Sequence, residues 1–452
     1  MKVFSLQQAV AATGGEFFGD PALLSQNVQG VVIDNREVQD GFLFIPIIGE
    51  QFDGHTFIPS AYDAGALCCL SEKKLDSQKP YILVKSTLDA FQALAAWYRT
   101  LFDIRLIAIT GSAGKTTTKE MIAAVLAQKY QTLKTEGNLN NQTGVPKMLF
   151  RLEPFHQVAV IEMGTNHFGE IEQLSKIAQP NDCVITNIGE AHIEHFGSKE
   201  GTLRAKCEIT SHQKPGGTLF ICGDDNLLFP LQSQQKSVVS YGFMDRNTLR
   251  VARHHERGLS GTDFTVSTSK GECAFHLPYP GKHMVLAALA AIAVGFAYGM
   301  TTEEIQSGLA CYAPVGGRMN IQKGATVTIL DDSYNANPSS MKAALDILNT
   351  AAGRKVCILG DMFELGEQSG KYHYEVGKYA ADKGIDHILL VGTGAKMMYD
   401  GAASSGGNAV HFATVEALCS GILSHIQSGD TVLVKASRGM KLEHILPFLL
   451  DI

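Results

Sequence analysis

The segment that most constrains the fold is a glycine-rich turn between an apolar strand and a helix. The apolar run Leu106–Ile109 leads directly into Thr-Gly-Ser-Ala-Gly-Lys-Thr-Thr-Thr, residues 110–118. Glycines allow backbone N–H groups to approach anionic oxygens, and the start of a helix adds a partial positive charge. The segment therefore predicts a phosphate-binding loop within an α/β domain.

The side chains of this loop suit a nucleoside triphosphate with Mg²⁺. Lys115 is placed to reach the terminal phosphates, and Thr116 can bind Mg²⁺ through its hydroxyl. Two residues separate Gly111 from Gly114, whereas the commonest phosphate loop has four residues there. Glycines alone could mark only a tight turn, but the Gly-Lys-Thr sequence favours phosphate binding. The predicted nucleotide contacts of the loop are Gly111, Ser112, Ala113, Gly114, Lys115, Thr116 and Thr117.

Composition excludes several classes of protein. A chain of 452 residues is too long for one core, so two or three domains are expected. The net charge of −7 argues against a nucleic-acid surface. Nine scattered cysteines without a C-x-x-C pair indicate reduced thiols in the cytoplasm. The alanine-rich stretch Met284–Ala297 is shorter than the about 20 residues of a membrane-spanning helix, so we expect a buried helix and no membrane partner.

Hydrophobic patterns divide the chain into three α/β units. We expect a small unit over residues 1–83, a central unit with a mostly parallel sheet over 84–311, and a Rossmann-like unit over 312–452. The polar, turn-rich residues 238–280 predict an antiparallel appendage of the central unit. The strand-like runs are Val31–Ile33, Phe42–Ile45, Leu106–Ile109, Val158–Ile161, Val184–Thr186, Thr218–Cys222, Val327–Leu330, Lys355–Leu359, His387–Val391, Ala409–Phe412 and Thr431–Val434.

Polar residues follow three strands of the central unit, at the edge where α/β sheets bind ligands. The first strand leads into the phosphate loop. Glu162 follows the second and could bind Mg²⁺, and Asn187 and His192 follow the third. Each alone could be an ordinary loop residue, but their convergence favours a site. Lys206 lies in a helical pattern and reads, on the sequence alone, as a solvated surface lysine.

Further candidates lie in an Asn-rich stretch and in the last unit. Residues 137–146 contain Asn138 and Asn141, which could bind phosphate or carboxylate groups or could satisfy their own backbone. Asn337 before Pro338 fits a helix N-cap, which leaves Asp332 as a candidate nucleotide contact. The remaining candidates are cations and one amide that could face an anionic substrate across a cleft, although each cation alone could be a solvated surface residue. They are Arg318, Asn335, Lys435 and Arg438.

Together these motifs resemble the Mur ligase family of ATP-dependent amide-forming enzymes, over nearly the whole chain. The segments that carry the resemblance are Gly-Asn-Leu-Asn-Asn-Gln-Thr-Gly-Val-Pro (137–146), Glu-Met-Gly-Thr-Asn-His (162–167), Asp-Ser-Tyr-Asn-Ala-Asn-Pro (332–338), Leu-Gly-Asp-Met-Phe-Glu-Leu-Gly (359–366) and Val-Lys-Ala-Ser-Arg-Gly-Met (434–440). In the first unit, Asp34-Asn35-Arg36 and Phe52-Asp53-Gly54-His55 resemble a UDP-sugar domain.

The resemblance implies a reaction and its partners. ATP phosphorylates the carboxylate of a UDP-N-acetylmuramoyl tripeptide, and the amine of D-Ala-D-Ala attacks the acyl phosphate. The resemblance implies that Lys115 stabilises the phosphate during transfer. It also implies that two Mg²⁺ ions are bound by Thr116, Glu162, His192 and a carbamylated Lys206. Arg318, Asp332 and Asn187 hold the nucleotide. The implied substrate contacts are Asn35, Arg36, Asn138, Asn141, Asn335, Asn337, Lys435 and Arg438.

Other interpretations stay open at this point. The chain could be another ligase of the same chemistry, such as a folylpolyglutamate synthase, or a phosphate-loop NTPase without ligase activity. The first-unit motifs disfavour the synthase, and the Asp-Ser-Tyr-Asn-Ala-Asn-Pro segment disfavours the NTPase. Met284 and Ala287 stand where the family usually offers asparagines to the adenine base. We expect a cytoplasmic monomer.

Overall fold

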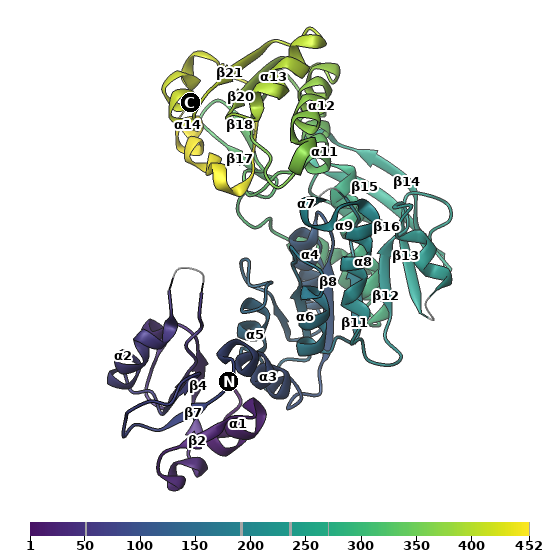
Figure 1. Ribbon diagram of the computed structural model, residues 1–452. Helices are drawn as coiled ribbons and strands as arrows, with labels where there is room; N and C mark the ends of the chain where they lie inside the picture. Colours follow the sequence, from purple (N-terminus) through teal and green to yellow (C-terminus); the bar gives the residue numbers. More distant parts are fainter. Residues whose placement is uncertain (50–51, 190–192, 235–236, 270, 452) are drawn as a thin grey trace.

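The computed structural model describes residues 1–49, 52–189, 193–234, 237–269 and 271–451. Three α/β units follow one another along the chain, with the N-terminal unit at the lower left of Figure 1 and the C-terminal unit at the top. The central unit lies between them and contacts both, so that one cleft is lined by residues of all three. Within the described ranges, no helix combines the length and the apolar character needed to cross a membrane.

The N-terminal unit contains a small mixed sheet with one helix-containing crossover. Its elements are β1 (Phe4–Ser5), α1 (Leu6–Thr13), β2 (Glu16–Phe18), β3 (Asn27–Val28), β4 (Gly30–Val32), β5 (Phe42–Phe44), α2 (Ile58–Asp63), β6 (Cys68–Ser71) and β7 (Tyr81–Leu83). The sheet order is β2-β7-β6-β5-β4, with β2 antiparallel to β7 and the other pairs parallel. Strands β1 and β3 form a separate antiparallel pair.

The central unit is built on a nine-stranded sheet. Its elements are α3 (Thr87–Arg99), β8 (Arg105–Thr110), α4 (Lys115–Leu126), β9 (Thr132–Lys134), α5 (Gly144–Leu149), β10 (Val158–Glu162), α6 (Glu170–Ala178), β11 (Asp182–Ile185), α7 (Ile193–Phe196), α8 (Lys199–Cys207), β12 (Leu219–Cys222), β13 (Val238–Gly242), β14 (Leu249–Glu256), β15 (Thr262–Thr268), β16 (Gly271–Leu277), α9 (Lys282–Ala297) and α10 (Thr302–Cys311). The order is β16-β15-β14-β13-β12-β11-β8-β10-β9. Because β8 lies inside a parallel region, its carboxyl end opens onto the ligand-binding edge of the sheet.

The predicted antiparallel appendage over residues 238–280 is only partly correct. Strands β14, β15 and β16 are antiparallel to one another, but β13 pairs in parallel with both β12 and β14, so the region continues the central sheet. The alanine-rich segment forms the buried helix α9, as predicted, and packs against α4. Small side chains on α9 suit close packing against the helix that follows the phosphate loop.

The C-terminal unit has a six-stranded sheet with helices on both faces. Its elements are β17 (Asn320–Lys323), β18 (Thr328–Asp331), α11 (Pro338–Asn349), β19 (Lys355–Gly360), α12 (Ser369–Asp382), β20 (His387–Val391), α13 (Ala395–Ser404), β21 (Ala409–Phe412), α14 (Val415–Gly421), β22 (Thr431–Lys435) and α15 (Leu446–Leu450). The order is β17-β18-β22-β19-β20-β21, and all pairs are parallel except β17 with β18. Two apolar clusters, one on each face, bury this sheet.

The predicted fold class, α/β with mostly parallel sheets, is confirmed. The patterns missed β1, β2, β3, β6 and β7 of the N-terminal unit, and the edge strands β9 and β17 of the two larger sheets. Strand β9 has only three residues, and the residues of β17 are polar or half-exposed, so neither gives a continuous apolar run.

Candidate active site

Two glycines give the phosphate loop its shape. Gly114 has φ +74°, in the left-handed region that favours glycine, and it is the residue before α4. Gly111 packs against the end of β11, where an added Cβ would lie 1.9 Å from the hydroxyl of Thr186. The loop therefore turns tightly between β8 and α4 and leaves the first turn of α4 without a side-chain cap.

Asn187 fixes the first half of this loop. Its main-chain oxygen accepts a hydrogen bond from Ser112 N at 3.1 Å, and its Oδ1 accepts one from Ala113 N at 2.8 Å. Thr186 adds a hydrogen bond from its hydroxyl to the Ala113 carbonyl at 2.6 Å. The neighbouring strand β11 thus holds the loop in shape, which leaves the N-terminus of α4 as the part that faces the cleft.

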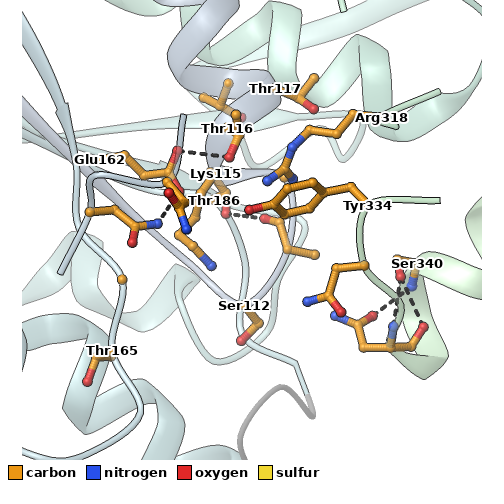
Figure 2. Close-up of a pocket in the computed structure, with 18 of the residues that line it drawn as sticks. Ser112, Lys115, Thr116, Thr117, Glu162, Thr165, Thr186, Arg318, Tyr334 and Ser340 are labelled. Atoms are coloured by element: carbon orange, nitrogen blue, oxygen red, sulfur yellow. Dashed lines mark hydrogen bonds between the residues drawn. The ribbon is translucent and has the colours of Figure 1, made fainter. Parts of the chain in front are cut away.

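A buried carboxylate lies beside the loop. Glu162, at the end of β10, is 2% exposed, and its Oε2 accepts a hydrogen bond from the Thr116 hydroxyl at 2.8 Å (Figure 2). Its Oε1 accepts one from Asn140 Nδ2 at 2.8 Å, and its main-chain N–H donates to the Thr135 hydroxyl at 2.9 Å. Two side chains therefore hold the carboxylate, and a third holds the backbone of Glu162, next to the first turn of α4.

Lys115 lies between the loop and the opposite wall of the cleft. Its Nζ donates to the Gly111 carbonyl at 2.8 Å. Burial lowers the pKa of Lys115, Glu162 partly opposes this shift, and Arg318 lowers the pKa further. Two cations directed at one half-buried space form a site in which an anionic ligand is favourable.

The opposite wall comes from the C-terminal unit. The Arg318 guanidinium lies over the Tyr334 ring, with 4.0 Å between Cζ and the ring centroid, and Figure 2 shows both side chains facing Lys115 across the cleft. Asp332, at the end of β18, accepts hydrogen bonds from Met319 N at 3.0 Å and from Lys435 Nζ at 2.5 Å. Asp332 thus links the segment that carries Arg318 to the end of β22.

The interpretation as a solvated surface cation is wrong for Lys435 but correct for Arg438. Lys435 is 2% exposed, and besides Asp332 its Nζ binds the Asn335 carbonyl at 2.9 Å. The Arg438 side chain is more than half exposed and pairs with Glu443 at 2.7 Å. Lys435 therefore supports the cleft wall, whereas Arg438 is not one of the described residues that line the cleft and is only a neighbour of Tyr334, with 5.7 Å between its Cζ and the Tyr334 ring centroid.

The asparagine candidates line the cleft, and three of them, Asn141, Asn335 and Asn337, also accept hydrogen bonds from nearby backbone N–H groups. Asn138, Asn141, Asn335 and Asn337 all contribute to its surface. The Asn141 side chain accepts from Gly144 N at 2.8 Å, as the alternative interpretation proposed. The predicted cap is confirmed: Asn337 accepts from Ser340 N at 2.9 Å at the start of α11, with Pro338 at its first position.

The cleft has a volume of about 1080 Å³ and receives residues from all three units. The N-terminal unit contributes Ile47, Ile48 and Gly49. Met284 and Ala287, which replace the asparagines usual in the family, are nearly buried and line it. The cavity is large enough for a nucleotide and part of a second substrate.

Asn35 and Arg36 do not reach the cleft described above. Asn35 Nδ2 donates to the Ser60 hydroxyl at 3.2 Å, and Arg36 pairs with Asp34 at 2.6 Å on the surface of the N-terminal unit. Hydrogen bonds from the Arg36 side chain and backbone lower the pKa of Asp34 to about 2. A substrate role for these two residues requires a ligand that extends over this unit.

The structure places Lys206 inside the protein, so the interpretation as a surface lysine is wrong. Lys206, on α8, is 1% exposed, and its Nζ lies 5.8 Å from the Phe196 ring centroid. Burial lowers its pKa well below the usual range, nearby Lys115 lowers it further, and Glu208 and Glu170 partly oppose this. His192, predicted as a metal ligand, lies outside the described residues.

The described residues supply part of a metal site. Among them, no group of three or more His, Cys, Asp or Glu side chains is arranged to hold a metal ion. Thr116 and Glu162 nevertheless offer two oxygen donors next to the phosphate loop. Mg²⁺ usually keeps several waters and uses one or two protein oxygens with phosphates, so this donor set fits it.

Sequence reasoning missed some of the residues that shape the site. Asn140 lies within the Asn-rich stretch but was not singled out, and Tyr334 lies within the 332–338 motif. Tertiary contacts with Glu162 and Arg318 give these two side chains their importance. The only sequence signal was their position inside segments already selected for other residues.

Comparisons with known families match nearly the whole chain. Residues 27–101 match the Mur ligase family, catalytic domain; residues 109–295 match the Mur ligase middle domain; and residues 317–438 match the Mur ligase, glutamate ligase domain. The UDP-N-acetylmuramoyl-tripeptide–D-alanyl-D-alanine ligase of Bacillus subtilis (strain 168) is 38% identical and covers 94% of this chain and 93% of its own. The enzyme of the same name from Escherichia coli (strain K12) is also 38% identical, over 98% of this chain and 97% of its own.

Solved structures agree with these relatives. A crystal structure of MurF from Acinetobacter baumannii superposes with a TM-score of 0.94 at 33% identity and covers 100% of both chains. MurF ligase from Thermotoga maritima in complex with ADP superposes with a TM-score of 0.84 at 28% identity, over 94% of this chain and 97% of that one. The chain belongs to the Mur ligase family, within its group of UDP-N-acetylmuramoyl-tripeptide–D-alanyl-D-alanine ligases.

Proposed function

We propose that this chain is a cytoplasmic, monomeric enzyme that uses ATP to join D-Ala-D-Ala to UDP-N-acetylmuramoyl tripeptide. The observation that supports this most strongly is the phosphate loop with buried Glu162 on one wall of the cleft and Arg318 on the other. Residues 1–83 bind the UDP-sugar part, 84–311 bind ATP, and 312–452 complete the site. Asn35 and Arg36 contact the UDP-sugar part of the substrate. The residues that contact the peptide substrates are Asn138, Asn141, Asn335, Asn337, Lys435 and Arg438.

The cleft residues support a phosphoryl transfer followed by amide formation. A carboxylate oxygen of the tripeptide attacks the γ-phosphorus, the bond to the ADP oxygen breaks, and an acyl phosphate and ADP result. The D-Ala-D-Ala amine then attacks the acyl carbon, loses a proton and releases inorganic phosphate. Lys115 and the first N–H groups of α4 stabilise the transferring phosphate, and Arg318 adds a second cation from the opposite wall.

We assign Thr116 and Glu162 as holders of one Mg²⁺. A bound Mg²⁺ would neutralise charge on the phosphates during transfer. The chain's own contribution is to fix the two oxygens: Asn140 holds Glu162 Oε1, and the helical position of Thr116 holds the hydroxyl beside Oε2. The second Mg²⁺ site would use Glu162, His192 and Lys206.

A carbamate on Lys206 would make that second site anionic. The ammonium is buried and lies near Lys115, and both conditions disfavour its charged form. In its neutral form the amine adds to CO₂: the N–C bond forms, a proton leaves, and an anionic carbamate results. Lys206→Ala should abolish turnover, and short carboxylic acids should partly restore it; full activity without rescue would refute the carbamate.

The test of the proposed function is the substrate dependence of ADP release. Purified enzyme is given ATP and Mg²⁺ with the tripeptide, with D-Ala-D-Ala, with both, or with neither. The proposal expects stoichiometric ADP, phosphate and amide product only when both substrates are present. Hydrolysis that is indifferent to both would instead establish an NTPase without ligase activity.

A further inference from the structure

Lys119 is a fully buried lysine that the proposed reaction does not use. It lies on α4, three residues after Thr116, and is 1% exposed. Its Nζ pairs with Glu120 at 2.7 Å and donates to the main-chain oxygen of Thr135 at 2.6 Å. A buried ammonium is costly unless such bonds satisfy it, so both bonds restrain its position.

Thr135 in turn holds Glu162. Thr135 is fully buried directly after β9, and its N–H donates to Val160 O at 3.0 Å. Its hydroxyl accepts the Glu162 main-chain N–H at 2.9 Å. Two hydrogen bonds therefore link α4 to β10: Lys119 holds the Thr135 carbonyl, and the Thr135 hydroxyl holds the main-chain N–H of Glu162, whose carboxylate lies beside Thr116.

We propose that Lys119 is a positioning residue that fixes the distance between the Thr116 hydroxyl and the Glu162 carboxylate. One end of this pair is on α4 and the other is on β10, and Lys119 joins α4 to the residue that holds the end of β10. Loss of this link leaves the loop intact but lets the two metal-binding oxygens move apart. The inference rests on the metal site of the proposed function.

Charge pairing with Glu120 does not by itself explain Lys119. Lys134, on β9, also pairs with Glu120, from a side chain that is about half exposed. Lys134 therefore offers a matched control, because its removal breaks an ion pair of the same carboxylate without touching Thr135. The bond to the Thr135 carbonyl is what distinguishes Lys119 from this neighbour.

The experiment measures Mn²⁺ binding to the ADP complex by electron paramagnetic resonance, with ADP affinity in EDTA and thermal unfolding as companion measurements. Lys119→Met should raise the Kd for Mn²⁺ about tenfold or more, while the Kd for ADP without metal changes less than about twofold. Thr135→Val, which removes the hydroxyl that holds Glu162, should have a similar effect. The Kd for Mn²⁺ of the double variant should be no higher than that of the single variant with the lower affinity, because both substitutions break the same link between α4 and β10. Lys134→Met should bind Mn²⁺ like the wild type.

Three results would overturn the proposal. One is wild-type Mn²⁺ affinity in Lys119→Met, and another is an equal loss in Lys134→Met. The third is a failure to fold of both Lys119→Met and Lys119→Gln, which would make Lys119 a residue of the fold rather than of the site. If the wild type itself binds no Mn²⁺ with ADP, the metal site of the proposed function fails, and the role of Lys119 fails with it.

Discussion

Two glycine-rich turns lead from a strand into a helix, one in each of the two large sheets. The first joins β8 to α4 and lines the cleft. The second is Gly392-Thr393-Gly394, which joins β20 to α13. Both place helix N–H groups at the carboxyl edge of a parallel sheet, where anions bind readily.

Neighbouring strands make the two turns different. Asp361 follows β19, beside β20, and its Oδ1 accepts the Ala395 N–H at 2.7 Å. This carboxylate fills the space beside the second turn so closely that an added Cβ on Gly392 would lie 2.5 Å from it. At the first turn, Asn187 from β11 holds only Ser112 and Ala113 and leaves the start of α4 to the cleft. The two turns therefore differ in where the neighbouring carboxylate lies: Asp361 accepts a main-chain N–H at the start of α13, whereas Glu162 accepts from the Thr116 side chain and leaves the N–H groups at the start of α4 to the cleft.

The largest expected effect comes from the lysine of the first turn. Lys115→Ala should lower kcat about 1000-fold, because it removes the cation directed at the transferring phosphate. Circular dichroism should show an unchanged fold. Lys396 is the matched control, since it lies in the first turn of α13 and contacts residues of its own helix, Asp400 at 3.7 Å and the Tyr399 ring centroid at 4.3 Å. Lys396→Ala should keep the wild-type rate, and an equal loss in both variants would remove the functional distinction between the turns.

Removal of the charge beside the first turn ranks second. Glu162→Gln can keep a hydrogen-bonding side chain next to Thr116 and Asn140 but loses the anionic oxygen for Mg²⁺. We expect kcat to fall about 100-fold and the Mg²⁺ concentration for half activation to rise. A steady-state titration with Mg²⁺ checks this. A normal Mg²⁺ dependence would show that the carboxylate serves only the fold.

The third prediction makes the first turn resemble the second. Asn187→Asp keeps the acceptor for Ala113 N but places a carboxylate beside the phosphate loop. Repulsion of about 1.4 kcal/mol would weaken ADP binding about tenfold, which isothermal titration calorimetry can measure. Unchanged ADP affinity would contradict the claim that a carboxylate bound to the backbone N–H groups of a turn keeps phosphate away from it.

The smallest effect belongs to the second turn. Asp361→Asn removes the negative charge at the N-terminus of α13 and should lower the free energy of unfolding by about 1 to 2 kcal/mol. Chemical denaturation measures this, and activity at low temperature should stay close to that of the wild type. A loss of activity without a loss of stability would indicate that Asp361 acts in the reaction.

The sequence predicted the sheets and the loop because both depend on local patterns. Apolar runs and the Gly-Lys-Thr segment lie within a few residues of one another, so strands such as β20 and β21 matched to the residue. Burial of Lys206 and Lys435 could not be predicted in this way, because their surroundings come from segments distant in the sequence. Local charge patterns describe both as ordinary surface cations.

The same limit explains the difference between the two turns. Gly392-Thr393-Gly394 and the first turn both carry glycines at a strand end, and Asp361 lies more than 30 residues away from the second. Only the pairing of β19 with β20 brings Asp361 to that helix start. Site residues that act through tertiary contacts, such as Asn140 and Lys119, escape sequence reasoning for this reason.

The most direct test of the account is the fate of the tripeptide's carboxylate oxygens. Tripeptide substrate labelled with ¹⁸O in its terminal carboxylate is converted with ATP and D-Ala-D-Ala, and the released phosphate is analysed by mass spectrometry. Transfer of phosphate to the carboxylate at the first turn predicts one ¹⁸O atom in each phosphate. Phosphate without ¹⁸O would show that water, not the carboxylate, receives the phosphoryl group, and would contradict the account.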